Sequence, residues 1–132
     1  MFPELTRDDV FRLETRRLWL RWPRMADANA ILRLAGEKAV AEMTASIPHP
    51  YPTQAVEPFI FGARKGNALG EHLALAITPR SKPNELIGMV SAHKQATGVP
   101  FIGYWLGTPH WGKGSATEAG WGLIGSLFSL SG

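Results

Sequence analysis

The sequence predicts an α/β fold of the α+β type, in which a mixed, mostly antiparallel sheet of about four strands is flanked by helices. Residues 17–22 alternate between basic and apolar side chains, the pattern of a strand with one wet face. Residues 72–77, 86–93 and 101–106 are further strand-like segments joined by short loops, which favours an antiparallel meander. Helical patterns between residues 27 and 65 separate the first strand from this meander.

The first two helices follow the first strand directly. Residues 27–35 place Ile31, Leu34 and Ala35 on one helical face, with Asp27 near the positive end and Gly36 as the stop. A second short helix is predicted over residues 38–44.

A third helix follows the proline-rich segment 48–52, which we expect to be an extended loop. Either Thr53 or Glu57 could cap this helix, which should run to about Lys65. Pro58 is tolerated only in a first helical turn, so the later start is favoured.

The chain ends in a helix without charged residues from Ala119 onwards. It carries two apolar stripes, and a helix that is apolar nearly all round should be buried on all sides. The stripes are Ala119, Leu123, Leu127 and Leu130, and Trp121, Ile124 and Phe128. We therefore expect that strands which would cover this helix are missing from the chain.

Length and composition indicate one domain over residues 1–132, able to bury roughly two-thirds of its surface. The chain has no cysteine, which excludes disulfides and cysteine-based metal sites or nucleophiles. Its four histidines are far apart, so a metal site is not expected. Trp19, Trp22, Trp105 and Trp121 are assigned to the core or to groove lining.

The formal charge of +3 is modest. The basic residues Arg16, Arg17, Arg21 and Arg24 are diluted by neighbouring acids, and we interpret them as a solvated face and not as a nucleic-acid patch. No run reaches the roughly 18 apolar residues of a membrane helix, and the N-terminus lacks a signal-peptide core. We expect a cytoplasmic protein.

Residues 102–119 form the most informative stretch: a short aromatic strand, a tight turn, a glycine-rich loop and the start of a helix. Gly112 and Gly114 let backbone N–H groups turn inward, and the positive end of the helix points into the same space. This combination predicts a site for a phosphate or pyrophosphate. The structural alternative is a strand–turn–helix corner whose glycines serve close packing alone.

Two common phosphate motifs fit this stretch poorly. A P-loop would need Ser or Thr after Lys113, where the sequence has Gly114, and also a later strand with a metal-binding acid. A dinucleotide fingerprint would need its third glycine at Thr117. A P-loop-like nucleotide binder therefore remains only a minor alternative.

The third motif is a coenzyme A loop, and here residues 102–106 and 111–119 resemble the acetyl-CoA motif of the GNAT N-acetyltransferase superfamily. They are most similar to its ribosomal-protein-alanine acetyltransferase-like branch. The pattern Q/R-x-x-G-x-G/A matches with Gly114 and Ala116 in the diagnostic places, while Trp111 departs from Gln or Arg. Ser115 stands where this branch commonly has Tyr. Segments 13–21 and 47–51 extend the resemblance over most of residues 13–128.

The resemblance implies an acyl-CoA N-acyltransferase-like fold and an acetyl-CoA-dependent transfer of an acetyl group to an amine, either a protein N-terminus or a small amine. Backbone amides of the loop and the helix start would hold the pyrophosphate, with added charge from Lys113. The strand at 104–106 would offer unpaired N–H and C=O groups to the pantetheine arm, and an amide of the 105–106 region would face the thioester carbonyl. The implied coenzyme residues are Tyr104, Trp105, Leu106, Gly112, Lys113, Gly114, Ser115, Ala116 and Thr117.

No catalytic residue can be assigned from the sequence. The acid that protonates the leaving thiolate, often a Tyr in this superfamily, would come from a part after the last helix here. His93, His110, His72 and Tyr104 are weak candidates with structural roles as alternatives; His72 should be exposed, and Tyr104 should pack against a neighbour. A non-catalytic CoA-binding remnant is therefore the main alternative. The open edge of strand 101–106 also predicts a homodimer.

Overall fold

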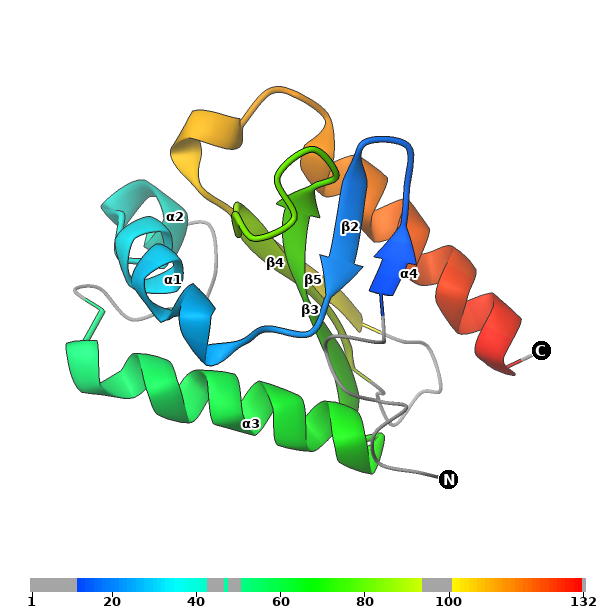
Figure 1. The fold of residues 1–132 in the computed structure, drawn as a ribbon, viewed down its shortest axis with the longest axis horizontal. Helices are drawn as coiled ribbons and strands as arrows, with labels where there is room; N and C mark the ends of the chain where they lie inside the picture. Colours follow the sequence, from blue (N-terminus) through cyan, green and yellow to red (C-terminus); the bar gives the residue numbers. More distant parts are fainter. Residues whose placement is uncertain (1–11, 43–46, 48–50, 94–100, 132) are drawn as a thin grey trace.

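The computed structural model describes residues 12–42, 47, 51–93 and 101–131, and it places a five-stranded sheet at the centre of the molecule (Figure 1). The strands lie in sequence order, and each pairs antiparallel with its neighbours. They are β1 (Arg12–Glu14), β2 (Leu18–Arg21), β3 (His72–Pro79), β4 (Gly88–His93) and β5 (Phe101–Leu106).

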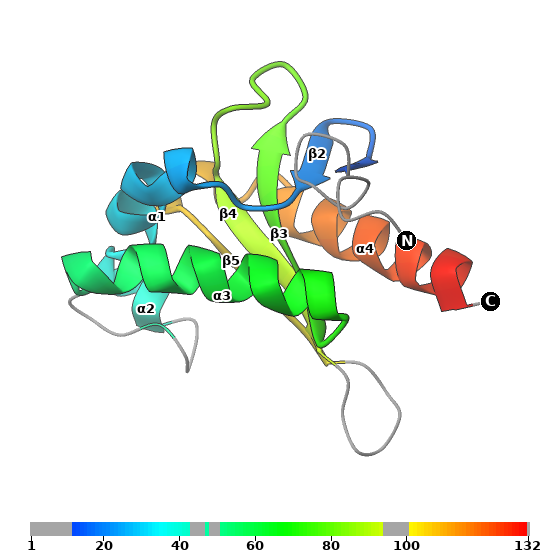
Figure 2. The same ribbon diagram turned by 60° about the horizontal axis from the view of Figure 1, so that its bottom comes forward.

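Helices cover both faces of this sheet (Figures 1 and 2). α1 (Ala28–Ala35), α2 (Lys38–Glu42) and α3 (Val56–Leu69) follow β2 and lie on one face. α4 (Ser115–Ser131) follows β5 and packs on the other face. The α/β class with flanking helices is confirmed, and all described strand pairs are antiparallel.

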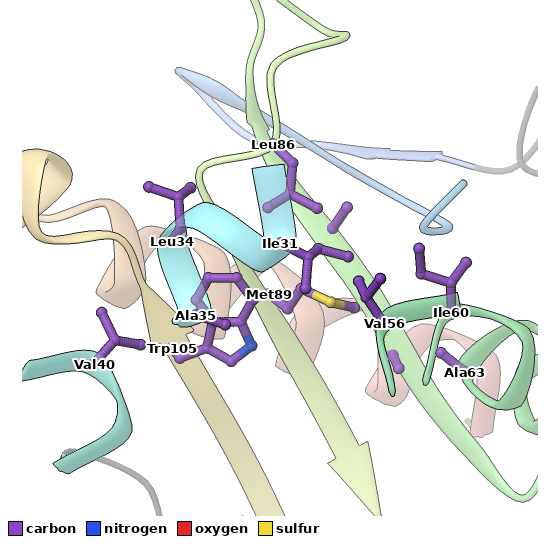
Figure 3. Packing of buried hydrophobic residues seen from close by; sticks show 12 residues of the cluster. Ile31, Leu34, Ala35, Val40, Val56, Ile60, Ala63, Leu86, Met89 and Trp105 are labelled. Carbon is purple, nitrogen blue, oxygen red and sulfur yellow. The ribbon is translucent and has the colours of Figure 1, made fainter. Parts of the chain in front are cut away.

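The alternation of β3 divides the core into two layers. Ala74 and Ala76 face α1–α3, where their small side chains let α3 approach the sheet, whereas Leu75 and Ile77 face α4. The first layer contains Ile31, Ile60, Met89 and Trp105, among others (Figure 3). The second contains Leu18, Leu20, Val90, Leu106, Ala119 and Leu123.

The sheet has one strand more than predicted, because β1 was missed. Three residues are too few to show a hydrophobic period, and β1 is defined by its pairing, with Leu13 opposite Leu20. β5 has the predicted bounds, β3 continues two residues past Ile77, and β4 begins at Gly88 instead of residue 86.

α1 ends at Gly36 as predicted. α3 begins at Val56 after a 3₁₀ turn over Thr53–Ala55, which is within one residue of the favoured start at Glu57. No side chain caps the helix. Pro58 lies in the first turn, as predicted. The helix continues past Lys65 and ends before Gly70, which has a φ of 74°. This left-handed conformation lets the N–H groups of Gly70 and Glu71 donate to the carbonyls of Asn67 and Gly66 in the last turn.

The basic cluster near the N-terminus is not uniformly solvated, which corrects the sequence interpretation. Arg16 and Arg17 are exposed, but Arg21 is only 3% exposed. Its Nη1 and Nη2 donate to Asp27 Oδ2 and Oδ1, both at 2.8 Å, and Nε donates to the carbonyl of Pro83. An arginine can be buried here because these carboxylate and carbonyl oxygens satisfy its donors.

α4 is not buried on all sides, contrary to the prediction. Ala119 and Leu123 are fully buried against the sheet, but the side chain of Trp121 is 69% exposed. Trp121 is therefore not a core residue, whereas Trp22 and Trp105 are. No helix among the described residues is long and apolar enough to cross a membrane.

Several predictions lie outside the described residues. These are the loop at 48–50, the end of the second helix at 43–44, His49, and the side chains of Leu127, Phe128 and Leu130.

Candidate functional site

A pocket of about 300 Å³ lies where β5 ends and α4 begins. Its walls come from the last residues of β5, the turn after it, the glycine loop, the first turn of α4 and one residue of α2. The lining residues are Val40, Tyr104, Trp105, Leu106, His110, Trp111, Gly112, Gly114, Ser115, Ala116 and Thr117.

β5 is the last strand of the described sheet, and it presents its outer backbone edge to this pocket. The N–H of Gly107 donates to Ile87 at 2.9 Å, and bonds in an antiparallel ladder recur at every second residue. Trp105 therefore directs its N–H and C=O toward β4, whereas Tyr104 and Leu106 direct theirs outward. Trp111 Nε1 donates to the Leu106 carbonyl at 2.6 Å, so of the outward groups of these two residues the described contacts leave both groups of Tyr104 and the N–H of Leu106 for a ligand.

The side chains of the same strand form two different parts of the pocket. Trp105 is 9% exposed and lies in the first core layer beneath α1, on the side of Val40 (Figure 3). Tyr104 is 50% exposed instead of packing against a neighbour as predicted. Trp105 thus fixes the strand, and Tyr104 is accessible from the pocket.

The glycine loop has the geometry of an anion site. Gly112 and Gly114 have φ of 77° and 76°, a region that favours glycine. The Gly114 carbonyl accepts the Glu118 N–H at 3.0 Å, so Gly114 is the residue that caps α4. The N–H groups of Ser115, Ala116 and Thr117 are then the first in the helix and lack intrahelical acceptors, so they can bind an anion.

Glu118, in the first turn of α4, is held by the turn between β1 and β2. Its Oε2 accepts a short hydrogen bond from the Thr15 hydroxyl and one of 2.8 Å from the Arg17 N–H, and Oε1 accepts from Arg17 Nε at 2.7 Å. Burial acts to raise the pKa of Glu118, but these hydrogen bonds outweigh it and the pKa lies below its ordinary value. Glu118 is therefore ionised at neutral pH.

A second carboxylate holds the turn after β5. Glu37, between α1 and α2, accepts from the Thr108 N–H at 3.1 Å and from its hydroxyl at 2.6 Å. His110, two residues on, lines the pocket. Burial lowers the pKa of His110, and the charge of Lys113 lowers it further, so the imidazole is neutral at pH 7.

The other candidate histidines lie elsewhere. His93 is paired with Phe101, at the opposite end of the β4–β5 ladder from Leu106 and roughly 17 Å along the strand. Its ring meets that of His72 edge-on at 5.5 Å, and burial, then His72, lowers the pKa of His93. His72 is half-buried rather than exposed as expected, because its ring packs over Gly66 and its Nε2 lies 3.1 Å from the Ala63 carbonyl.

The structure brings the residues predicted to bind coenzyme together in one pocket, except Lys113, which is exposed on the loop and does not line it. Trp111, which stands where the family pattern has Gln or Arg, donates a hydrogen bond from its indole N–H to the Leu106 carbonyl. Thr15, Arg17 and Glu118 were missed, because only the fold places residues about a hundred positions apart in contact. Within the described part of the chain, no three His, Asp or Glu residues are grouped to hold a metal.

Comparisons with known proteins agree with this geometry. The sequence model of the acetyltransferase (GNAT) domain family matches residues 17–132. A comparison with curated protein sequences gives no significant match.

Solved structures of acetyltransferases share the fold. The GNAT-family acetyltransferase from Bacillus anthracis is 16% identical, with a TM-score of 0.77 over 92% of this chain and 68% of that one. The ribosomal-protein α-N-acetyltransferase RimL is 18% identical, with a TM-score of 0.77 over 92% and 66%. The microcin self-immunity acetyltransferase MccE, solved with acetyl-CoA and AMP, is 23% identical, with a TM-score of 0.70 over 84% and 62%. The chain thus spans about two-thirds of the length of these proteins, and at such identities the likeness shows the fold alone.

Proposed function

Because the chain belongs to the GNAT acetyltransferase family, we propose that it binds acetyl-CoA in the pocket between β5 and α4 and transfers the acetyl group to an amine. The observation that supports this most is the meeting of two binding elements in one pocket: the open edge of β5 and the glycine loop that begins α4. The first suits the amide groups of a pantetheine arm, and the second suits a pyrophosphate.

The residues present fit this coenzyme in chemistry and in order. Tyr104 offers an outward N–H and C=O, as β-strand addition requires. Ser115, Ala116 and Thr117 supply backbone donors, and Gly112 and Gly114 place no side chain at two positions of the loop. Lys113, outside the pocket lining, would act by its charge.

Acetyl-CoA supplies the acetyl group as a thioester. The outward N–H of Leu106 is placed to donate to a carbonyl bound along β5 and so stabilise negative charge that develops on its oxygen. Among the described pocket residues, Tyr104 and His110 are titratable, and the neutral imidazole of His110 is able to accept a proton. We assign no catalytic acid or base.

The acceptor that we propose is the amine of a protein N-terminus or of a small molecule, in the cytoplasm. Support for the first comes from RimL, which acts on a ribosomal protein and shares the fold. A panel of peptides and small amines, assayed for acetyl transfer, tests this choice.

We also propose that two copies can pair through the β5 edge, since this strand has no outer partner among the described strands. Such pairing would use the outward groups of Tyr104 that the coenzyme needs. Sedimentation with and without CoA tests it: CoA should shift a dimer toward monomer, and a dimer indifferent to CoA would place the contact elsewhere.

The binding test uses two glycines in the same backbone conformation. Gly114→Ala and Gly70→Ala both put a side chain at positive φ, 76° and 74°, so both should cost about 1–2 kcal/mol of stability. Calorimetric titration with CoA should show at least a tenfold loss of affinity for Gly114→Ala alone, since only Gly114 belongs to the loop.

Three outcomes separate the alternatives. CoA binding with acetyl transfer to an amine supports the enzyme. CoA binding without transfer to any amine identifies a CoA-binding protein without catalysis. Magnesium-dependent ATP binding, with no CoA binding, would favour the P-loop-like alternative and contradict the proposal.

A further inference from the structure

We propose that Arg17 is a phosphate-binding residue of the coenzyme site, supplied by the β1–β2 turn and held in place by Glu118. This inference rests on the proposed function. Arg17 is not in the pocket lining, and it lies beside the loop because α4 packs against the β1–β2 turn.

Distances place the Arg17 guanidinium next to the glycine loop. Its Nη2 lies 3.6 Å from the position that a Cβ on Gly114 would occupy. The helix approaches the turn so closely that a Cβ on Gly122, one turn after Glu118, would lie 2.6 Å from Thr15 Cγ2. The turn itself is anchored, since the Arg80 N–H donates to the Arg17 carbonyl at 2.9 Å.

The hydrogen bonds of Arg17 leave part of its guanidinium for a ligand. Nε donates to Glu118, and no described hydrogen bond uses Nη1 or Nη2. The side chain is 49% exposed, so these nitrogens are accessible. An arginine oriented through one edge can offer its other donors to a phosphate with little further loss of conformational entropy.

Charge gives a second reason for this arrangement. Glu118 is ionised in the first turn of the helix whose N-terminus would bind the pyrophosphate, and a carboxylate there repels an anion. Arg17 neutralises that carboxylate and at the same time brings a cation to Gly114. Lys113 also carries positive charge near the loop, but no described contact orients it.

The test compares Arg17→Ala with Arg16→Ala, which removes the same charge from the same turn at an exposed position. Calorimetry with CoA should show about a fivefold to tenfold weaker affinity for Arg17→Ala and less than about a twofold change for Arg16→Ala. Titration with pantetheine, which lacks phosphate, should give the same affinity for both variants and the unmodified protein. The salt dependence of CoA binding should become shallower in Arg17→Ala.

Two further variants keep the inference testable if Arg17→Ala loosens the turn. Arg17→Lys keeps the charge without the paired donors and should lose less affinity than Arg17→Ala. Adding Glu118→Gln to Arg17→Ala removes the unneutralised carboxylate and should recover part of the lost CoA affinity. Failure to recover any would contradict the charge argument.

The outcomes distinguish this inference from the proposed function. Unchanged CoA affinity in Arg17→Ala, or equal losses for CoA and pantetheine, would overturn the role of Arg17 while leaving the coenzyme site intact. An unmodified protein that binds no CoA would overturn both.

Discussion

Arg17 and Arg21, in the hairpin formed by β1 and β2, belong to the same basic segment of the sequence, but the fold gives them different ion pairs. Arg21 pairs with Asp27 just before α1, and Arg17 pairs with Glu118 in the first turn of α4. Exposure separates them: the side chains are 3% and 3% exposed in the first pair, and 49% and 18% in the second.

The difference lets one residue type serve stability at one position and, as proposed above, ligand binding at another. Arg21 uses Nε, Nη1 and Nη2 on protein oxygens: the two Nη groups join β2 to Asp27 just before α1, and Nε joins it to Pro83 between β3 and β4. Arg17 commits Nε alone and directs Nη2 toward the glycine loop. We therefore expect the first pair to control folding and the second to control ligand affinity.

Breaking the buried pair should have the largest effect. Asp27→Ala leaves the Arg21 charge buried without its partner and should lower the free energy of unfolding by about 3–5 kcal/mol. Urea denaturation measures this. Glu42→Ala is the control, since the Lys38–Glu42 pair is exposed and 3.8 Å long and should be worth less than about 0.5 kcal/mol. A loss below about 1 kcal/mol for Asp27→Ala would remove the contrast between the two pairs.

Lysine substitutions should sharpen the comparison at constant charge. Arg21→Lys cannot reproduce the two-pronged bond to Asp27 and should lose about 1.5–3 kcal/mol. Arg17→Lys should stay within about 0.5 kcal/mol of the unmodified protein, because its side chain is half exposed. Urea denaturation of both variants measures these losses. Similar losses in free energy of unfolding at the two positions would mean that Arg17 also stabilises the fold.

A double-mutant cycle measures the exposed pair itself. Arg17→Ala, Glu118→Gln and the double variant should give a coupling energy of about 0.2–1 kcal/mol in unfolding. A coupling above about 2 kcal/mol would place this pair in the class of buried ones.

The smallest effect should appear in the pH dependence. The folded pKa of Glu118 is below its ordinary value of 4.5, so its contribution to stability is complete above pH 4.5 and is lost as the pH falls through the folded pKa. The stability difference between the unmodified protein and Glu118→Gln, measured by urea denaturation across this range, should therefore shrink as the solution is acidified. A difference that grows on acidification would mean that the pKa is raised.

The local order of the chain was predictable because its signals are local. The alternation in β3, Gly36 at the end of α1 and the apolar strand at Phe101–Leu106 follow from residues adjacent in sequence. The placement of the glycine loop after β5 was predictable for the same reason.

Burial was less predictable, since it depends on distant partners. Arg21 was interpreted as solvated because Asp27 and Pro83 are not visible as its partners in the sequence. Trp121 was assigned to the core or to groove lining, in a helix that carries no charge from Ala119 onwards, but its side chain is largely exposed. β1 escaped notice because its stability comes from pairing with β2 and from α4.

The sequence by itself determined which stretches form the glycine loop and the strand before it, because positive φ at Gly112 and Gly114 and strand formation at Phe101–Leu106 are properties of short segments. Only the tertiary structure decided which groups face the pocket: the ladder turned Tyr104 and Leu106 outward and Trp105 inward, and α4 brought Glu118 to Arg17. The physical reason is that backbone direction and charge pairing across a hundred residues depend on packing, which no local pattern encodes.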